Sequence, residues 1–264
     1  MTLFERKGSP SEILRETILS FPSFELRKGK VWQIGNVTPV DDHGIYFRIG
    51  RTSKSTLEIY QDRNFVDQQF DAAPYTHVLL DVQLELCAIA KKSRLSPKPK
   101  GIAMQLSRVL NQAMKAKEYG ARFEIVEIND PHDFVTHIRS AYNISKFWMT
   151  FSLPNIFDTN DFIKPMERLL KETSGEIGKT ELKGDGLNPK NLEALTRSAA
   201  STGDDAGAVL QPEKDRKRVR KFLRGNPVTI TQEDLSDQDQ MLSILQQMRE
   251  VYEQIRGMLG KNDD

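Results

Sequence analysis

Basic side chains are concentrated between residues 214 and 224, where seven lysines and arginines share eleven positions with one acid, Asp215. Such a run is suited to binding phosphates, because each phosphate that a cation neutralises releases counterions and adds affinity. The spacing of Val219, Phe222 and Leu223 predicts a helix over residues 213–223 that these apolar side chains anchor. We expect these cations to form a ridge that binds DNA or RNA. Five of them point outward, namely Arg216, Lys217, Arg220, Lys221 and Arg224, and two support them, namely Lys214 and Arg218.

Two other interpretations of this segment stay open. Acids such as Glu213 and Asp204-Asp205 would neutralise a solvated helix face, and an acidic protein would bind the ridge in place of nucleic acid. The net charge of the whole chain is only +1, so affinity for polyanions has to come from local clusters. A second basic tract extends the footprint if it lies near the first: Lys91, Lys92, Arg94, Lys98 and Lys100.

The patterns that would support catalysis or metal binding are weaker. His132 and His137 are five residues apart, a spacing that does not place both on one helix face. Asp81, Glu85 and Lys91 have the residue types of a metal-dependent nuclease but not its compact spacing. Phosphate-loop, nucleophile-elbow and dinucleotide-binding motifs do not occur in the sequence. We predict no catalytic residue, no metal and no cofactor, and keep a metal-dependent nuclease as the alternative.

The elements that must position these residues indicate an α+β fold. A capping-box pattern at Ser9 and Glu12 predicts a helix over residues 10–20. Short segments of β-formers follow, with connections too short for crossover helices, so we expect an antiparallel, meander-like N-terminal sheet. These predicted strands are residues 24–26, 31–37, 44–50, 57–60, 76–81 and 86–91, and the arms 78–81 and 86–89 form one hairpin.

The second half of the chain alternates helices with short strands, which predicts helices packed on a small, mostly antiparallel sheet. Alternation along one strand places Phe147, Met149 and Phe151 in the core and Trp148 on the opposite face. Predicted helices are residues 102–120, 131–141, 160–173, 189–199 and 213–223, and predicted strands are 122–128, 145–153, 176–183, 206–211 and 227–231.

Three regions are predicted: a β-rich region over residues 1–95, an α+β region over 96–232, and a long C-terminal amphipathic helix within 233–264. That helix, predicted over residues 236–259, has an a/d heptad seam. The seam residues are Met241, Leu245, Met248, Tyr252, Ile255 and Leu259. Either the helix packs on its own domain, or it pairs or exchanges between subunits as a coiled coil and makes the protein a homo-oligomer.

The composition favours a soluble protein in a reducing compartment. The mean hydropathy is −0.52 and no apolar run approaches the roughly 20 residues that span a bilayer. Cys87 is the single cysteine, which excludes an intramolecular disulfide and leaves too few ligands for a cysteine-based zinc site. We expect Cys87 to be a buried small hydrophobe and the protein to be cytoplasmic, without membrane insertion.

Three stretches resemble landmarks of an uncharacterised family of bacterial proteins that are associated with genomic islands of phage defence: residues 45–50 (IYFRIG), 73–78 (APYTHV) with Asp81, and 151–155 (FSLPN). The resemblance covers most of the chain up to about residue 230. It implies a cytoplasmic antiviral defence component that acts with a partner protein or on nucleic acid, and it implies no active-site residues.

These observations predict a nucleic-acid-binding or sensing component of a bacterial anti-phage system that self-associates through its C-terminal helix. The alternatives are a metal-dependent nuclease effector and a protein–protein scaffold subunit that binds no nucleic acid.

Overall fold

The computed structural model describes residues 8–119, 122–152, 163–231, 235 and 237–257. The chain has an α+β fold and is divided into two compact units. Unit 1 comprises residues 1–125 and 232–246, and unit 2 comprises residues 126–231 and 247–264. The division falls near residue 125 and not near residue 95, because Ile102, Leu106 and Val109 pack into the core of the N-terminal sheet.

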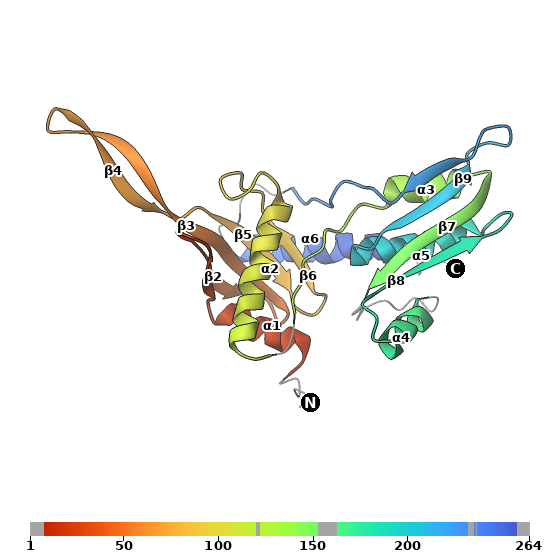
Figure 1. The fold of residues 1–264 in the computed structure, drawn as a ribbon, viewed down its shortest axis with the longest axis horizontal. Helices are drawn as coiled ribbons and strands as arrows, with labels where there is room; N and C mark the ends of the chain where they lie inside the picture. The colour runs from red at the N-terminus through yellow and green to blue at the C-terminus, as the bar shows by residue number, and fades with distance from the viewer. Residues whose placement is uncertain (1–7, 120–121, 153–162, 232–234, 236, 258–264) are drawn as a thin grey trace. The chain divides into compact units, whose positions relative to one another are not determined.

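Unit 1 is an antiparallel sheet with two helices packed into its core (Figure 1). Its elements are α1 (Pro10–Leu19), β1 (Ser23–Arg27), β2 (Lys30–Pro39), β3 (Gly44–Gln61), β4 (Asn64–Ala72), β5 (Tyr75–Asp81), β6 (Leu86–Ile89) and α2 (Pro99–Ala116). The strand order is β1-β2-β3-β5-β6, and β4 pairs with the outer half of β3. Ile45, Phe47 and Ile49 of β3 are buried against the apolar stripes of both helices.

Local sequence signals explain several boundaries in unit 1. The Glu12 N–H donates to Ser9 Oγ at 3.3 Å and the Ser9 N–H donates to Glu12 Oε2 at 2.8 Å, which confirms the capping box of α1. The predicted hairpin of residues 78–81 and 86–89 is confirmed by the pairing of β5 with β6. Asp81 fixes its turn, because its carboxylate accepts the backbone N–H groups of Gln83 and Leu84.

Unit 2 is a four-stranded antiparallel sheet of order β10-β9-β7-β8, with α3 and α5 packed on one face. Its elements are α3 (His132–Ser140), β7 (Asn143–Ser152), α4 (Lys164–Glu172), β8 (Ile177–Lys183), α5 (Pro189–Thr202), β9 (Ala206–Gln211) and β10 (Val219–Phe222). Phe147 and Met149 of β7 pack with Phe134 and Ile138 of α3 and with Leu195 of α5 in the core. The predicted core alternation of β7 is therefore confirmed.

The C-terminal helix α6 (Gln238–Arg256) contributes buried side chains to both units. Leu245 is fully buried beside Gly44 in unit 1, and Ile255 belongs to the core of unit 2. The described seam residues are buried within one chain, so a coiled coil between subunits would require the helix to be exchanged. Leu259 lies outside the described residues.

Several predicted elements are wrong. Residues 219–222 form a strand and not part of a helix, because the outer edge of β9 has backbone groups that need partners and β10 supplies them. Residues 122–128 and 227–231 form no ladder. Asn129 and Pro227 make an isolated bridge, and beside it the Val228 N–H donates to the Ile128 carbonyl at 3.0 Å. The helix predicted to end at residue 120 ends at Ala116, and β4 was not predicted.

Candidate nucleic-acid interface

The face of the unit 2 sheet opposite α3 and α5 is called the open face here. Strand alternation assigns Lys146, Trp148 and Thr150 of β7 to it, opposite the buried Phe147 and Met149. The register aligns Trp148 with Gly207 of β9, which in turn aligns with Phe222 of β10. One row across three strands therefore places an indole, a glycine and a phenyl ring side by side.

Gly207 allows the Trp148 ring to lie against the sheet. A Cβ atom at this position would collide with the indole ring. The indole meets the ring of Phe222 edge to face, with centroids 5.6 Å apart and planes at 77°. The glycine thus lets two aromatic side chains form one platform on the open face.

Cationic groups surround this aromatic platform. The Arg220 guanidinium lies 5.6 Å from the centroid of the Trp148 ring, and Lys146 Nζ lies 5.8 Å from it. Arg224 follows β10 and places its guanidinium 4.7 Å from the centre of the Phe222 ring. These distances are within the range of cation–π attraction, so the platform and the cations form one continuous surface.

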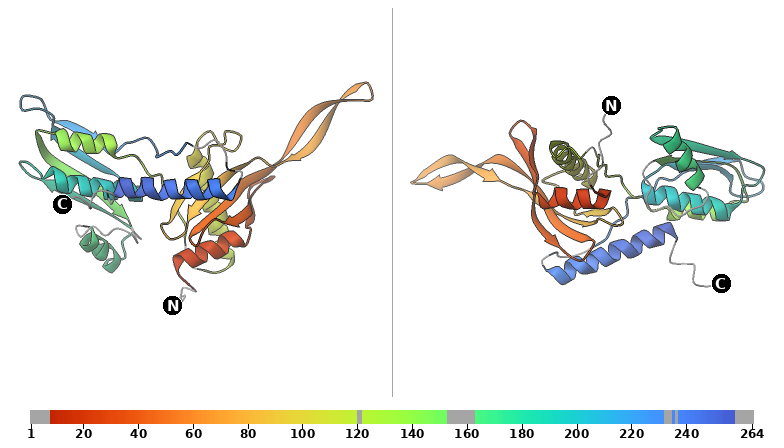
Figure 2. Two further views of the ribbon diagram at one scale, coloured as in Figure 1. Left: turned by 180° about the vertical axis from the view of Figure 1, so that it is seen from behind. Right: turned by 90° about the horizontal axis from the view of Figure 1, so that it is seen from below.

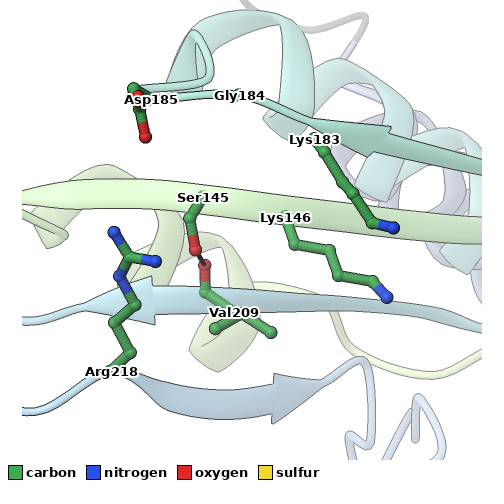
Figure 3. Close-up of a pocket in the computed structure, with 7 residues that line it drawn as sticks. All are labelled: Ser145, Lys146, Lys183, Gly184, Asp185, Val209 and Arg218. Carbon is green, nitrogen blue, oxygen red and sulfur yellow. Dashed lines mark hydrogen bonds between the residues drawn. The ribbon is translucent and has the colours of Figure 1, made fainter.

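A shallow pocket of about 450 Å³ adjoins the platform on the open face (Figure 3). Its polar lining comes from two strands and the two loops beside them: Ser145 and Lys146 of β7, Lys183 of β8, Asp185 after β8, and Arg218 before β10. In Figure 3 the Lys146 and Lys183 side chains extend in the same direction, and Arg218 reaches from the opposite side of the pocket toward Asp185. The pocket therefore brings three cations together on the same sheet face as Trp148, namely Lys146, Lys183 and Arg218.

Glu181 of β8 orders two of these cations. Its carboxylate is 2.8 Å from Lys146 Nζ and 3.0 Å from Lys183 Nζ. The hydrogen bond from Lys146 contributes most, and that from Lys183 next, to lowering the pKa of Glu181 to about 2. Glu181 is thus an anion at neutral pH and offsets part of the positive charge of the open face.

A family model described as a domain of unknown function matches residues 9–248, which is most of the chain. The chain belongs to the DUF4747 family. No curated protein and no solved structure matches this DUF4747 protein.

The structure divides the seven predicted cations of the DUF4747 chain into three groups. Arg218, Arg220 and Arg224 border the open face. Lys221 pairs with the buried Ala208 and is half-buried toward the helix-covered face. The remaining three are exposed in the loop between β9 and β10: Lys214, Arg216 and Lys217.

Of the acids predicted to neutralise the basic segment, Glu213 pairs with one of its cations and Asp204 has other partners. Arg216 pairs with Glu213 at 3.3 Å, with both side chains exposed. Asp204 instead accepts hydrogen bonds from Thr202 and Ser152, and burial raises its pKa. Among the residues that the structure describes, no carboxylate forms an ion pair with the other six cations of the segment.

Sequence reasoning missed the partners of this segment in the DUF4747 chain. The helical pattern predicts that Phe222 anchors a helix, whereas it lies in β10 beside Trp148. The prediction that Trp148 lies opposite the core is confirmed, but the pattern does not predict its neighbours. Lys146, Lys179 and Lys183 are absent from the predicted site, although their alternation with Phe147, Thr180 and Leu182 is the usual signal of a strand with one polar face. The second basic tract belongs to unit 1, where its first four residues lie between β6 and α2 and Lys100 lies in the first turn of α2.

The other chemical candidates have structural explanations. Within the described ranges, no three His, Cys, Asp or Glu side chains gather into a metal site. Burial raises the pKa of the Cys87 thiol to about 12, as expected for a small residue packed against the core. None of the described helices has the length and apolar character that crossing a bilayer requires.

Two of the three landmark stretches of the family resemblance meet in unit 1, where residues 44–50 of β3 pair with residues 75–81 of β5. On the face of this pair opposite the Phe47 core, Arg48 Nε donates to Tyr46 Oη at 2.9 Å, and Tyr46 Oη is 2.7 Å from His77 Nδ1. The Arg48 guanidinium also lies 4.6 Å from the centre of the Tyr75 ring. Residues 153–155 of the third stretch lie outside the described part of the chain.

Proposed function

We propose that this DUF4747 protein binds single-stranded nucleic acid on the open face of unit 2, as a cytoplasmic component of bacterial anti-phage defence. The observation that carries the proposal is the contact of Trp148 with Phe222 on a sheet face bordered by Arg220, Arg224 and Lys146. The defence role and the cytoplasmic location rest on the family resemblance and on the composition.

Aromatic rings on an open sheet favour single strands over duplexes, because only unpaired bases expose their faces for stacking. Phe222 is 40% exposed, so a base can reach its ring without unfolding the sheet. The pocket beside Lys146 supplies cations for the phosphate that precedes or follows a stacked base. Stacking and phosphate neutralisation both tolerate many sequences, so we expect weak sequence preference.

The test is the affinity of the purified full chain for fluorescein-labelled 20-mers of uridine and of thymidine, measured by anisotropy over a salt series. Replacing Arg218, Arg220 and Arg224 together by glutamate is expected to weaken binding by about tenfold or more and to flatten the salt dependence. The matched control replaces three exposed lysines that belong to helices and not to the unit 2 sheet by glutamate: Lys115, Lys171 and Lys190.

A second variant separates stacking from charge. Replacing Trp148 and Phe222 by alanine is expected to weaken binding by roughly 1–3 kcal/mol per stacked base and to leave the salt dependence unchanged. Equal binding by wild type and both variants, or no binding by wild type at 50 mM salt, would contradict the proposal. Incubation with Mg²⁺ or Mn²⁺ is expected to leave the oligonucleotide intact, and its cleavage would support the nuclease alternative.

A further inference from the structure

The outer half of β3 and all of β4 form a two-stranded arm over residues 53–72 that extends from the sheet of unit 1 (Figures 1 and 2). The arm pairs without a bulge from Ser53 with Ala72 to Gln61 with Asn64. Its turn consists of Asp62 and Arg63, both with positive φ, as a two-residue hairpin turn requires. All residues of β4 except Ala72 are exposed.

One face of the arm is acidic and aromatic. Residues directly opposite each other share a face, so Glu58 lies with Asp67, and Tyr60 lies with Phe65. Lys54 with Asp71 and Thr56 with Gln69 also lie on this face, so every charged residue of the paired strands is on it. Tyr60 is 65% exposed and Phe65 is 84% exposed, with ring centroids 5.0 Å apart.

This face has the features of a surface that a binding partner covers. A two-stranded ribbon with no packing partner is marginally stable in water, and the like charges of Glu58 and Asp67 oppose each other directly. Two large aromatic side chains at the end of an exposed arm are a typical feature of an interaction site. The arm carries four acids and two bases, a negative balance that disfavours nucleic acid and favours a basic partner.

We infer that the acidic, aromatic face of the arm docks on the open face of unit 2 in a second copy of this chain. The described open face carries six bases and two acids, opposite in sign to the arm. The bases are Lys146, Lys179, Lys183, Arg218, Arg220 and Arg224, and the acids are Glu181 and Asp185.

The chemistry of the two surfaces matches beyond net charge. Tyr60 and Phe65 offer ring faces to the guanidinium groups of Arg220 and Arg224, as Trp148 and Phe222 do within unit 2. The arm thus presents acids and aromatic rings where a single strand presents phosphates and bases. The contact joins two different surfaces, so it is head-to-tail, and one chain can take part twice.

Docking of the arm excludes nucleic acid from the open face. This regulatory consequence rests on the proposed function, whereas the association itself does not. A single-stranded ligand is therefore expected to release monomers, and a rise in salt is expected to do the same, because both partners are charged and exposed.

Light scattering coupled to gel filtration tests the association at low salt over a concentration series. Wild type is expected to give a mass above 30.1 kDa that falls as salt increases. Replacing Glu58, Asp67 and Asp71 by lysine is expected to give monomers, as is the triple glutamate variant of Arg218, Arg220 and Arg224. The matched control replaces three exposed acids of unit 1 outside the arm by lysine: Asp42, Glu118 and Glu124.

Mixing the two monomeric variants provides the decisive measurement. Each retains one intact surface, and their altered surfaces are again opposite in charge, so the mixture is expected to associate. Wild type that stays monomeric at every concentration overturns the inference. Association that survives either charge reversal also overturns it. If association survives the sheet reversal but is lost when Val66 and Phe70 are replaced by serine, the arms pack on each other and not on the open face.

Addition of the thymidine 20-mer separates this inference from the proposed function. If the charge reversals abolish association but the oligonucleotide neither binds nor releases monomers, the docking stands and the proposed function fails. If the oligonucleotide binds the open face of a wild-type chain that never associates, the proposed function stands and the docking fails.

Discussion

At the scale of single residues, the open face depends on small choices in neighbouring strands. Gly207 has no side chain, so Trp148 lies across β9 and reaches Phe222. Glu181 has the opposite effect on ligand binding, because it holds Lys146 and Lys183 in ion pairs that a phosphate must displace. One carboxylate therefore limits how strongly this surface attracts polyanions.

Replacing Glu181 by glutamine is expected to strengthen binding of the 20-mers several-fold at neutral pH. The change frees two ammonium groups, so the slope of log affinity against log salt should steepen by roughly 0.7 for each additional phosphate contacted. The folded pKa of Glu181 lies below its ordinary value, so its ion pairs are present above about pH 4.5 and are lost as the pH falls toward 2. An unchanged affinity and slope would show that these lysines do not contact the ligand.

At the scale of elements, the decisive difference is that the basic segment ends in a strand. A helix would point Arg220 and Lys221 outward together, whereas β10 places them on opposite faces of the sheet. Arg220 aligns with Val209 on the open face, and Lys221 aligns with the buried Ala208. Adjacent residues of the same charge thus have different surroundings.

This difference predicts unequal effects from neighbouring substitutions. Arg220→Glu is expected to weaken oligonucleotide binding by about tenfold, because it reverses a charge beside the Trp148 ring. Lys221→Glu carries the same charge change on the other face and is expected to change affinity by less than about twofold. Anisotropy titrations of the two single variants at one salt concentration measure this, and equal losses would favour the helical arrangement.

At the scale of the whole molecule, α6 contributes buried side chains to two separate cores. Leu245 is buried in unit 1, and Ile255 is buried in unit 2, where Arg197 donates to the carbonyls of Gln254 and Ile255 at 3.1 and 3.3 Å. The apolar seam that suggested a coiled coil is therefore occupied within one chain.

Substitutions in the two halves of α6 are expected to destabilise different units. Leu245→Ala and Ile255→Ala each remove buried methyl groups and should cost about 2–5 kcal/mol. Hydrogen exchange measured by mass spectrometry should show faster exchange in β3 and β5 for the first variant and in α5 for the second. Equal acceleration in both units by both variants would mean that α6 unfolds as a whole and not unit by unit.

Local chemistry made much of the fold predictable. Ser9 with Glu12 set the start of α1, and the heptad positions of α6 predicted the side chains that are buried. The arm could not be predicted because β4 is exposed on both faces and has no apolar alternation. Asp62 and Arg63 are also not the Asn-Gly or Asp-Gly pair that signals a tight hairpin.

Residue types and spacing alone predict that cations gather between residues 214 and 224, that Trp148 points away from the Phe147 core, and that the chain is α+β. That these cations and Trp148 share one surface follows only from the pairing of the strands. The reason is that a strand edge selects its partner through backbone hydrogen bonds, which carry no side-chain signature. The pairing of β10 with β9 therefore overrode the helical pattern and sorted the basic residues onto two faces.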